Sequence, residues 1–292
     1  MFYVLIAGLL FIQCGKPKEK LLVQSTPASN SSKNLNISIL IDLSDRIDPE
    51  KNTNSTMPYF QRDVEYIKSI DKGFLDHIKS KKVIQLNDQM QVFFNPEPSD
   101  PKMNDLTKQL KVSFDKNTTK DNISLVDKQY STLPLQIYQS AIKDKQYVGS
   151  DIWEFFKNKI ADYCIKEDHR NILFILTDGY IYHKDSKFSE GKKTSYLTPE
   201  LIKSLKLTSS DFKTKMQDNG LGFIKANEDL ENIEVIVLGI NPSKGNPFEG
   251  DIIKEYWENW FKEMKIKNYQ IKSADLPSNL EPIILKAITG KN

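Results

Sequence analysis

Residues 36–46 read NISILIDLSDR, an apolar run that stops abruptly at acidic and hydroxyl side chains. A second run of the same kind, NILFILTDG, occupies residues 171–179. Continuous apolar runs of this length are typical of strands that are buried on both faces of a parallel sheet. Ligands bind beyond the carboxyl ends of such strands, so the polar residues after the two runs are expected to converge. Oxygen atoms gathered at one point are what a hard divalent cation such as Mg²⁺ requires.

Strand and helix patterns alternate along the whole chain. The predicted strands are Asn36–Ile41, Met90–Phe94, Lys111–Phe114, Asn171–Leu176, Glu234–Gly239 and Tyr269–Ser273. Apolar residues at helical spacing predict helices at Tyr59–Ser80, Leu133–Ile142 (with Pro134 at its start), Ile152–Cys164, Pro199–Leu205, Ile252–Met264 and Asn279–Ile288. This alternation predicts an α/β fold, a doubly wound domain with a mostly parallel central sheet flanked by helices.

The folded domain is expected to span residues 35–292. Residues 15–34 are rich in Lys, Ser, Pro and Asn, a composition typical of a flexible tether. Within the domain, polar segments near residues 48–58, 95–130 and 180–230 interrupt the pattern and are interpreted as insertions. The last of them is predicted to hold one short helix, near Pro199–Leu205.

The N-terminus carries an apolar run, Phe2–Ile12, that is followed by Gln13 and Cys14. The run is too short to span a bilayer and fits the apolar part of a signal peptide. It resembles a bacterial lipoprotein signal, in which the cysteine after the run is lipidated. The resemblance implies a signal peptide at residues 1–14, a lipid anchor on Cys14 and a place in the cell envelope, on the periplasmic face or the surface. A simple secretory signal or a buried N-terminal strand is the alternative.

The overall composition excludes some classes of function. The 41 Lys and Arg residues nearly balance the 39 Asp and Glu residues, leaving a net charge of +2. The sequence therefore lacks the excess of basic residues that is typical of nucleic-acid-binding proteins. The sequence has no second long apolar stretch, so no internal membrane span is expected. Cys164 lies on the apolar face of a predicted helix and is expected to be a buried, inert thiol.

A third loop, Gly149-Ser150-Asp151, stands before a predicted helix between the two opening runs. The three loops, in this order, resemble the metal-ion-dependent adhesion site of the von Willebrand factor A (integrin I) domain. That family has Asp-x-Ser-x-Ser after its first strand, Gly-Thr/Ser-Asp/Asn before a central helix, and often Thr-Asp-Gly after its fourth strand. The resemblance runs from about Leu35 to the C-terminus.

The resemblance implies a metal site with four side chains. Asp42, Ser44 and Ser150 would bind Mg²⁺ (or Mn²⁺ or Ca²⁺) directly or through water, and Asp178 through water. In the family an acidic side chain of a partner protein completes the coordination shell. A site with few direct carboxylates leaves the metal electrophilic, so it seeks an external carboxylate.

Arg46 departs from the family pattern, because it stands where the family has its second serine. A guanidinium is always cationic and cannot ligate a metal. Either Asp45 or water takes the vacant position and the metal stays, or Arg46 turns into the site and pairs with Asp178 or Asp42 in place of the cation.

Ordinary structural roles are the alternative for each loop. Ser44 and Asp45 are also common turn formers after a strand. Ser150 or Asp151 would cap the next helix, with Glu154 completing a capping box. Thr177, Asp178 and Gly179 would form a simple turn; within a site, Asp151 and Thr177 would lie behind the ligands.

The sequence favours a binding module over an enzyme. The main hypothesis is a membrane-tethered extracytoplasmic domain that engages an acidic group of an unidentified protein partner, with lysine-rich insertions around the metal. A Mg²⁺-dependent phosphatase with Asp42 as nucleophile would need an acid two residues later, where this chain has Ser44. A structural surface lipoprotein with a degenerate, metal-free site is the third hypothesis.

Overall fold

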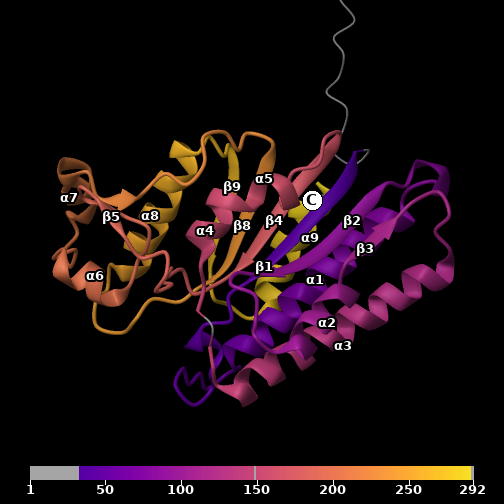
Figure 1. Cartoon of the computed structure of the whole chain (residues 1–292), viewed down its shortest axis with the longest axis horizontal. Coiled ribbons are helices and arrows are strands. Elements are labelled where there is room, and N and C mark those ends of the chain that lie inside the picture. The colour runs from indigo at the N-terminus through magenta and orange to yellow at the C-terminus, as the bar shows by residue number, and fades with distance from the viewer. Residues whose placement is uncertain (1–32, 148, 291–292) are drawn as a thin grey trace, which may run out of the picture.

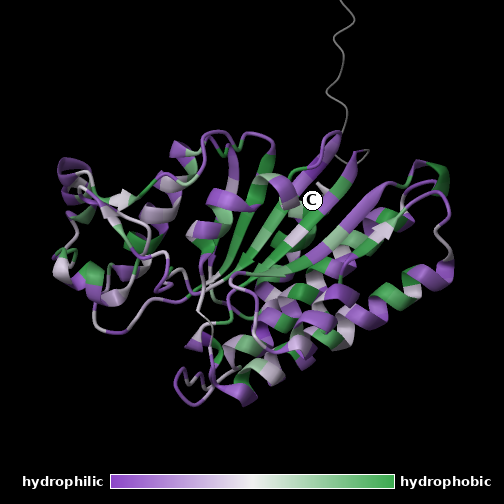
Figure 2. Ribbon diagram, viewed as in Figure 1, coloured by the Kyte–Doolittle hydropathy of each residue, from purple (hydrophilic) through white to green (hydrophobic). Residues whose placement is uncertain are grey.

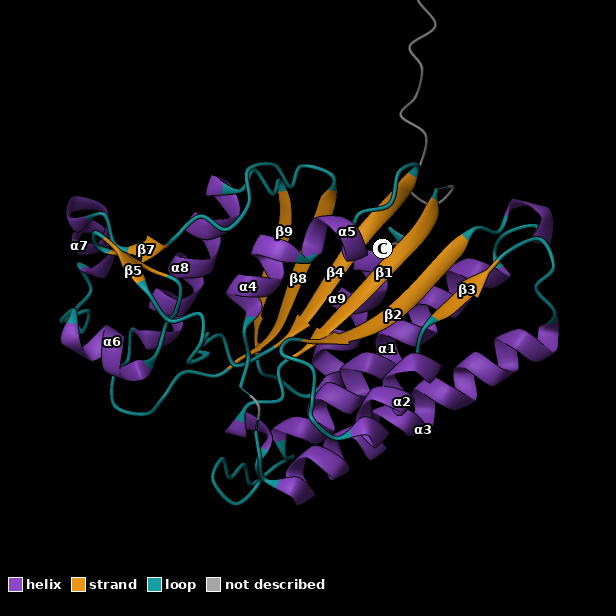
Figure 3. Ribbon diagram, in the orientation of Figure 1, coloured by secondary structure: helices purple, strands orange, loops and turns teal. Residues whose placement is uncertain are grey.

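A six-stranded sheet forms the centre of the computed structural model, which describes residues 33–147 and 149–290 (Figure 3). Its strands are β1 (Asn34–Ile41), β2 (Asp88–Phe94), β3 (Val112–Phe114), β4 (His169–Leu176), β8 (Ile233–Ile240) and β9 (Asn268–Ser273). They lie in the order β3-β2-β1-β4-β8-β9, and every pairing is parallel except that of β2 with β3. The predicted α/β class with a mostly parallel sheet is confirmed.

Helices cover both faces of this sheet (Figure 1). One face packs against α1 (Tyr59–Lys79), α2 (Pro101–Gln109), α3 (Lys120–Asp144) and α9 (Pro277–Thr289). The other face packs against α4 (Ile152–Asn158), α5 (Ile160–Cys164) and α8 (Glu249–Glu263). Strand β1 serves both layers, because Ile37 and Ile39 join the first core and Leu40 joins the second. All three side chains are buried, as the continuous apolar run predicts.

Residues 180–230 form more structure than the sequence predicts. They contain the helices α6 (Pro199–Ser204) and α7 (Phe212–Asn219) and a small sheet of β5 (Ser189–Glu190), β6 (Lys193–Thr194) and β7 (Gly222–Phe223). Phe212, Met216 and Phe223 join the core on the α8 side, which fixes this segment to the domain. Two-residue strands are too short for periodicity to reveal them.

Two predicted helices differ from those observed. The single helix predicted at Ile152–Cys164 is divided into α4 and α5 at Lys159, where φ is −122°. The helix predicted from Leu133 begins earlier, at Lys120, so Pro134 lies inside α3 and not at its start. A capping box between Thr119 and Asn122 fixes this earlier beginning.

The aromatic side chains of α8 belong to the core. Trp257 and Trp260 are at most 1% exposed, and Trp257 Nε1 donates to the carbonyl oxygen of Gly179 over 2.8 Å. That bond ties α8 to the loop after β4. Cys164 is buried as expected, and burial raises its pKa to about 12.

The predicted signal peptide, Cys14 and most of the tether lie outside the described residues. Within residues 33–147 and 149–290, no helix is long and apolar enough to cross a bilayer.

Candidate functional site

The three candidate loops meet at the carboxyl edge of the parallel sheet. Ile41 of β1 pairs with Leu176 of β4, and the backbone N–H of Asp42 continues the ladder by donating to Leu176 O over 3.0 Å. The third loop joins them through an antiparallel bridge between Gly149 and Leu43. The convergence predicted from two strand ends is therefore observed, with the third loop beside them.

A pocket of about 850 Å³ opens at this edge, and we call it the sheet-edge pocket. Ser44, Ser150 and Asp178 all line it, one from each loop. Asp178 Oδ1 accepts a hydrogen bond from the backbone N–H of Tyr180 over 3.1 Å. Among the described residues, neither serine hydroxyl nor Asp178 Oδ2 has a hydrogen-bond partner. Three oxygen atoms thus remain available to a ligand.

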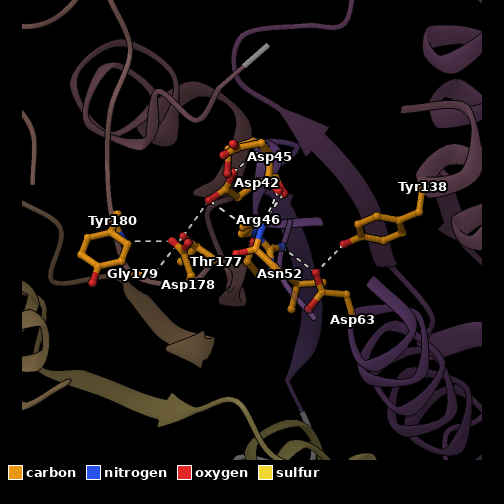
Figure 4. Close-up of polar contacts among 12 residues, drawn as sticks. Asp42, Asp45, Arg46, Asn52, Asp63, Tyr138, Thr177, Asp178, Gly179 and Tyr180 are labelled. Carbon is orange, nitrogen blue, oxygen red and sulfur yellow. Dashed lines mark hydrogen bonds and ion pairs between the residues drawn. The ribbon is translucent and has the colours of Figure 1, made fainter. Parts of the chain in front are cut away.

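Asp42 does not line the sheet-edge pocket, and Figure 4 shows its contacts with Thr177 and Arg46. Its side chain is buried, and both carboxylate oxygens accept hydrogen bonds of 2.8 Å, from Ser44 N and Thr177 Oγ1. Thr177 Oγ1 also accepts from the backbone N–H of Gly179. Asp42 therefore holds two of the three loops in place, and Thr177 does not line the pocket.

Arg46 does not line the sheet-edge pocket. Its guanidinium lies between Asp42 and Asp63 (Figure 4). Its guanidinium donates to the backbone oxygens of Asp42 and Leu176 and to the Asp63 carboxylate, with 2.5 Å between Arg46 Nη2 and Asp63 Oδ2. Arg46 Nε lies 3.5 Å from Asp42 Oδ2, and within the described chain Arg46 forms no ion pair with Asp178. Arg46 thus neutralises charge behind the site without filling the pocket.

The ion pair of Arg46 with Asp63 is buried on both sides, with 6% and 2% of the two residues exposed. Burial opposes the charge of Arg46, but the neighbouring carboxylates of Asp63 and Asp42 hold its pKa above the ordinary value. Burial raises the pKa of Asp63, against the lowering effects of Arg46 and the Tyr138 hydroxyl, which donates over 2.8 Å. The role of Asp63 was not predicted, although an acidic residue on the apolar side of a predicted helix is a signal of a buried charge pair.

Asp45 and Asp151 have other partners. Asp45 is exposed at the rim, where Lys51 Nζ lies 3.0 Å from its carboxylate. Asp151 Oδ1 caps α4 by accepting from Glu154 N over 3.0 Å, so the predicted capping role is confirmed for this residue. Asp151 Oδ2 lies 3.4 Å from Nδ1 of His183.

Asp178 has the most strongly perturbed carboxyl group among the residues that line the pocket. Burial, followed by the charge of Asp42, raises the pKa of Asp178 to about 7, with Arg46 opposing the shift. A positive ion beside Asp178 would relieve both effects. Among the described residues, no group of three or more His, Cys, Asp or Glu side chains is placed to hold a metal. A cation here would depend on the serine hydroxyls, which suit hard ions such as Mg²⁺.

The walls of the pocket come from residues that the sequence analysis did not single out. Four tyrosines line it, namely Tyr59, Tyr147, Tyr180 and Tyr182, together with the lysines Lys51, Lys145 and Lys244. The hydroxyls of the first three tyrosines donate to Asn241, Asp48 and Glu249. These bonds fix the rings, so much of the pocket wall is built before any ligand arrives.

Comparison with known proteins gives distant likenesses of fold. No family model matches the chain, and no curated protein matches it. Three solved structures each match over 88% of this chain. An aerotolerance-related membrane protein from Bacteroides fragilis is 14% identical and matches over 100% of its own length with a TM-score of 0.38, and the conserved hypothetical protein BatB from Bacteroides thetaiotaomicron is 11% identical and matches over 100% of its length with a TM-score of 0.39. The pilus adhesin SpaC from Lactobacillus rhamnosus GG is 11% identical and matches over 30% of its length with a TM-score of 0.39. TM-scores this low carry no argument about the site or its function.

Proposed function

We propose that this chain is a tethered extracytoplasmic protein-binding module of the von Willebrand factor A type. A divalent cation in the sheet-edge pocket would take an acidic group from the partner. The observation that carries the proposal is the set of three oxygens, from three loops, that face one pocket without a hydrogen-bond partner in the described chain. They belong to Ser44, Ser150 and Asp178, three of the four ligands that the family resemblance implies.

The residues present fit a hard cation. The Ser44 and Ser150 hydroxyls and the Asp178 carboxylate would hold Mg²⁺, or Mn²⁺ or Ca²⁺, with water in the remaining positions. Asp42 would act indirectly, by fixing the Ser44 backbone and the Thr177 hydroxyl. When bound, the cation supplies an open coordination position for a carboxylate. Lys51 and Lys145 at the pocket are paired with Asp45 and Glu50, and Lys244 adds positive charge that would attract an acidic partner surface.

The tether forms the second part of the proposal. Residues 1–14 would direct export, and a lipid on Cys14 would hold the mature chain in the cell envelope. The polar composition of residues 15–32 supports a flexible link between that anchor and the domain.

A metal-free module is the second candidate function. It is favoured by the 3.5 Å approach of Arg46 Nε to Asp42 Oδ2, which already supplies a positive charge behind the site. The phosphatase hypothesis gains no support from the geometry. Asp42 is 2% exposed and both of its carboxylate oxygens accept hydrogen bonds, so it is poorly placed to attack a substrate.

Calorimetric titration of Mg²⁺ and Mn²⁺ into the full chain tests the metal. We expect binding heat for the natural chain, and loss of it in Asp178→Asn and Ser150→Ala. Asp76→Asn is the control, because Asp76 is an exposed acid on α1 that does not line the pocket. Absence of heat from folded natural protein, or equal heat in all four proteins, would contradict the cation and favour the metal-free module.

Capture of partners from envelope extracts tests the binding role. The protein is immobilised and washed with Mg²⁺ or with a chelator, and the Asp178→Asn variant is processed in parallel. A partner that is retained with Mg²⁺ and released by the chelator supports the proposal. Partners that Asp178→Asn retains equally well would show that binding does not use the sheet-edge pocket.

A further inference from the structure

An exposed apolar turn lies at the edge of the sheet opposite the pocket. The 3₁₀ turn η3 (Val83–Gln85) immediately precedes β2, and Figure 2 shows it as a hydrophobic corner of the molecule. Val83 is 48% exposed and Ile84 is 80% exposed. Among the described residues, Ile84 is the most exposed large apolar side chain. Turns ordinarily carry Gly, Pro, Asn, Asp or Ser, so two adjacent aliphatic residues here call for a partner.

The segment from Ser80 to Asn87, which we call the 80–87 loop, is fixed to the start of the first strand. Lys81 Nζ donates to Asn34 Oδ1 over 2.5 Å and to Asp88 Oδ2 over 2.7 Å. Leu86 is buried behind the turn and anchors it. The turn is therefore held beside the point where the chain enters the fold.

Two exposed basic residues stand just before the apolar turn in the sequence. Lys79 and Lys82 precede the turn in the sequence and are exposed. Within the described chain, their side-chain amines form neither a hydrogen bond nor an ion pair. Lys33, the first described residue, precedes β1 at the same edge. Aliphatic tips among lysines match an anionic bilayer surface, whose interface accepts apolar side chains and whose headgroups attract cations.

We propose that the 80–87 loop rests on the anionic bilayer that holds the lipid anchor. Val83 and Ile84 enter the interfacial layer, and Lys79 and Lys82 lie over the headgroups. The inference rests on the proposed tether at Cys14. Lys33 follows Cys14 by 19 positions, and a flexible link of that length has an end-to-end distance of about 24 Å. The edge with the 80–87 loop is therefore kept near the membrane.

This contact would orient the whole domain. Parallel strands place their beginnings at one edge and their ends at the other, so the 80–87 loop and the sheet-edge pocket face opposite ways. With the loop on the bilayer, the pocket faces away from the membrane. A lipid anchor alone would leave the domain free to rotate about its tether.

Tryptophan quenching by brominated lipids tests the contact. The full chain carrying Ile84→Trp is purified from membranes and reconstituted into vesicles of phosphatidylcholine and phosphatidylglycerol. The native tryptophans Trp153, Trp257 and Trp260 are at most 4% exposed and give a constant background. Ser55→Trp is the matched control, because Ser55 is exposed in the loop beside the pocket.

We expect bromolipids to quench the added indole of Ile84→Trp and to blue-shift its emission, with neither change in Ser55→Trp. Adding Lys82→Glu to Ile84→Trp should reduce the quenching. A chain that floats with the vesicles but shows equal quenching at both positions would overturn the loop contact alone. A chain that does not float with the vesicles would overturn both the loop contact and the anchor, while leaving the cation titration unaffected.

Discussion

At the level of single residues, Arg46 and Asp63 form a charge pair that water scarcely reaches. The guanidinium is 2.5 Å from the Asp63 carboxylate and also satisfies two backbone oxygens at the strand ends. Buried pairs of this kind contribute little net stability, but the loss of one partner leaves an uncompensated buried charge. The two residues are therefore expected to respond to substitution as a unit.

Arg46→Ser should lower the free energy of unfolding by about 3–5 kcal/mol, because Asp63 loses its counter-ion. Arg46→Ser combined with Asp63→Asn should recover part of that loss. The unpaired charge is then gone, although the Asp42 and Leu176 carbonyl oxygens still lack the guanidinium. Urea denaturation followed by circular dichroism gives the three values. A double variant as unstable as the single one would show that charge is not the cause.

The positions of the site residues were predictable because each follows an apolar run or precedes a helix. Ser44, Ser150 and Asp178 do line one pocket. Those patterns do not show which side chains reach the pocket surface and which are buried behind it. Asp42 and Arg46 do not line the pocket, since their partners, Thr177 and Asp63, come from distant parts of the chain. A linear motif assigns residue types to a site, but long-range hydrogen bonds decide which side chains reach its surface.

At the level of elements, helix α1 buries the carboxyl group of Asp71 without an ion-pair partner in the described chain to compensate it. Asp71 of α1 is 3% exposed, and its Oδ1 has no hydrogen-bond partner within the described residues. Burial, followed by the nearby charge of Asp127 on α3, raises its pKa to about 7, with Lys79 opposing. Burial, followed by the charge of Asp71, holds the pKa of Tyr130 of α3 well above its ordinary value. Asp71 therefore remains protonated in the fold well above the pH at which an unfolded chain ionises it.

The raised pKa of Asp71 makes the fold less stable as the pH rises. Between about pH 4 and pH 7 the unfolded chain loses this proton and the folded chain keeps it, so stability falls across that window and then levels. Asp71→Asn should match the natural chain near pH 4 and exceed it by up to about 4 kcal/mol above pH 7. Thermal unfolding from pH 4 to 8 measures this, with Asp76→Asn, an exposed position on α1, as control. Parallel curves for Asp71→Asn and the natural chain would refute it.

The elements that sequence patterns predicted well are those with long apolar periodicity. The central strands and α1 agree with the prediction to within two residues at each end. The patterns failed where the fold is local and polar. In α3, the capping box at Thr119 and the tolerated Pro134 extend a helix whose apolar signal is clear only in its second half. In residues 180–230, short strands are held by contacts with α8 and not by their own sequence.

At the level of the whole molecule, the parallel sheet separates two surfaces with different chemistry. The ends of β1 and β4 present the polar sheet-edge pocket, and the beginnings of β1 and β2 present the 80–87 loop. A module that is anchored at one edge and binds at the other keeps its pocket clear of the bilayer. The proposed orientation would thus follow from parallel topology, in which a chain that enters at one edge ends its strands at the other.

Two exposed lysines allow this orientation to be measured. Lys82 flanks the apolar turn and Lys244 lies at the rim of the sheet-edge pocket. In full-length protein on anionic vesicles, Lys82→Cys should react with a bulky maleimide more slowly than in detergent. Lys244→Cys should react equally fast in both, because the pocket faces water. Cys164 is buried and adds little background, which the unsubstituted chain measures directly. Equal slowing at both positions would mean that the domain has no fixed orientation on the membrane. Slowing at Lys244→Cys alone would mean that the pocket, and not the 80–87 loop, faces the bilayer.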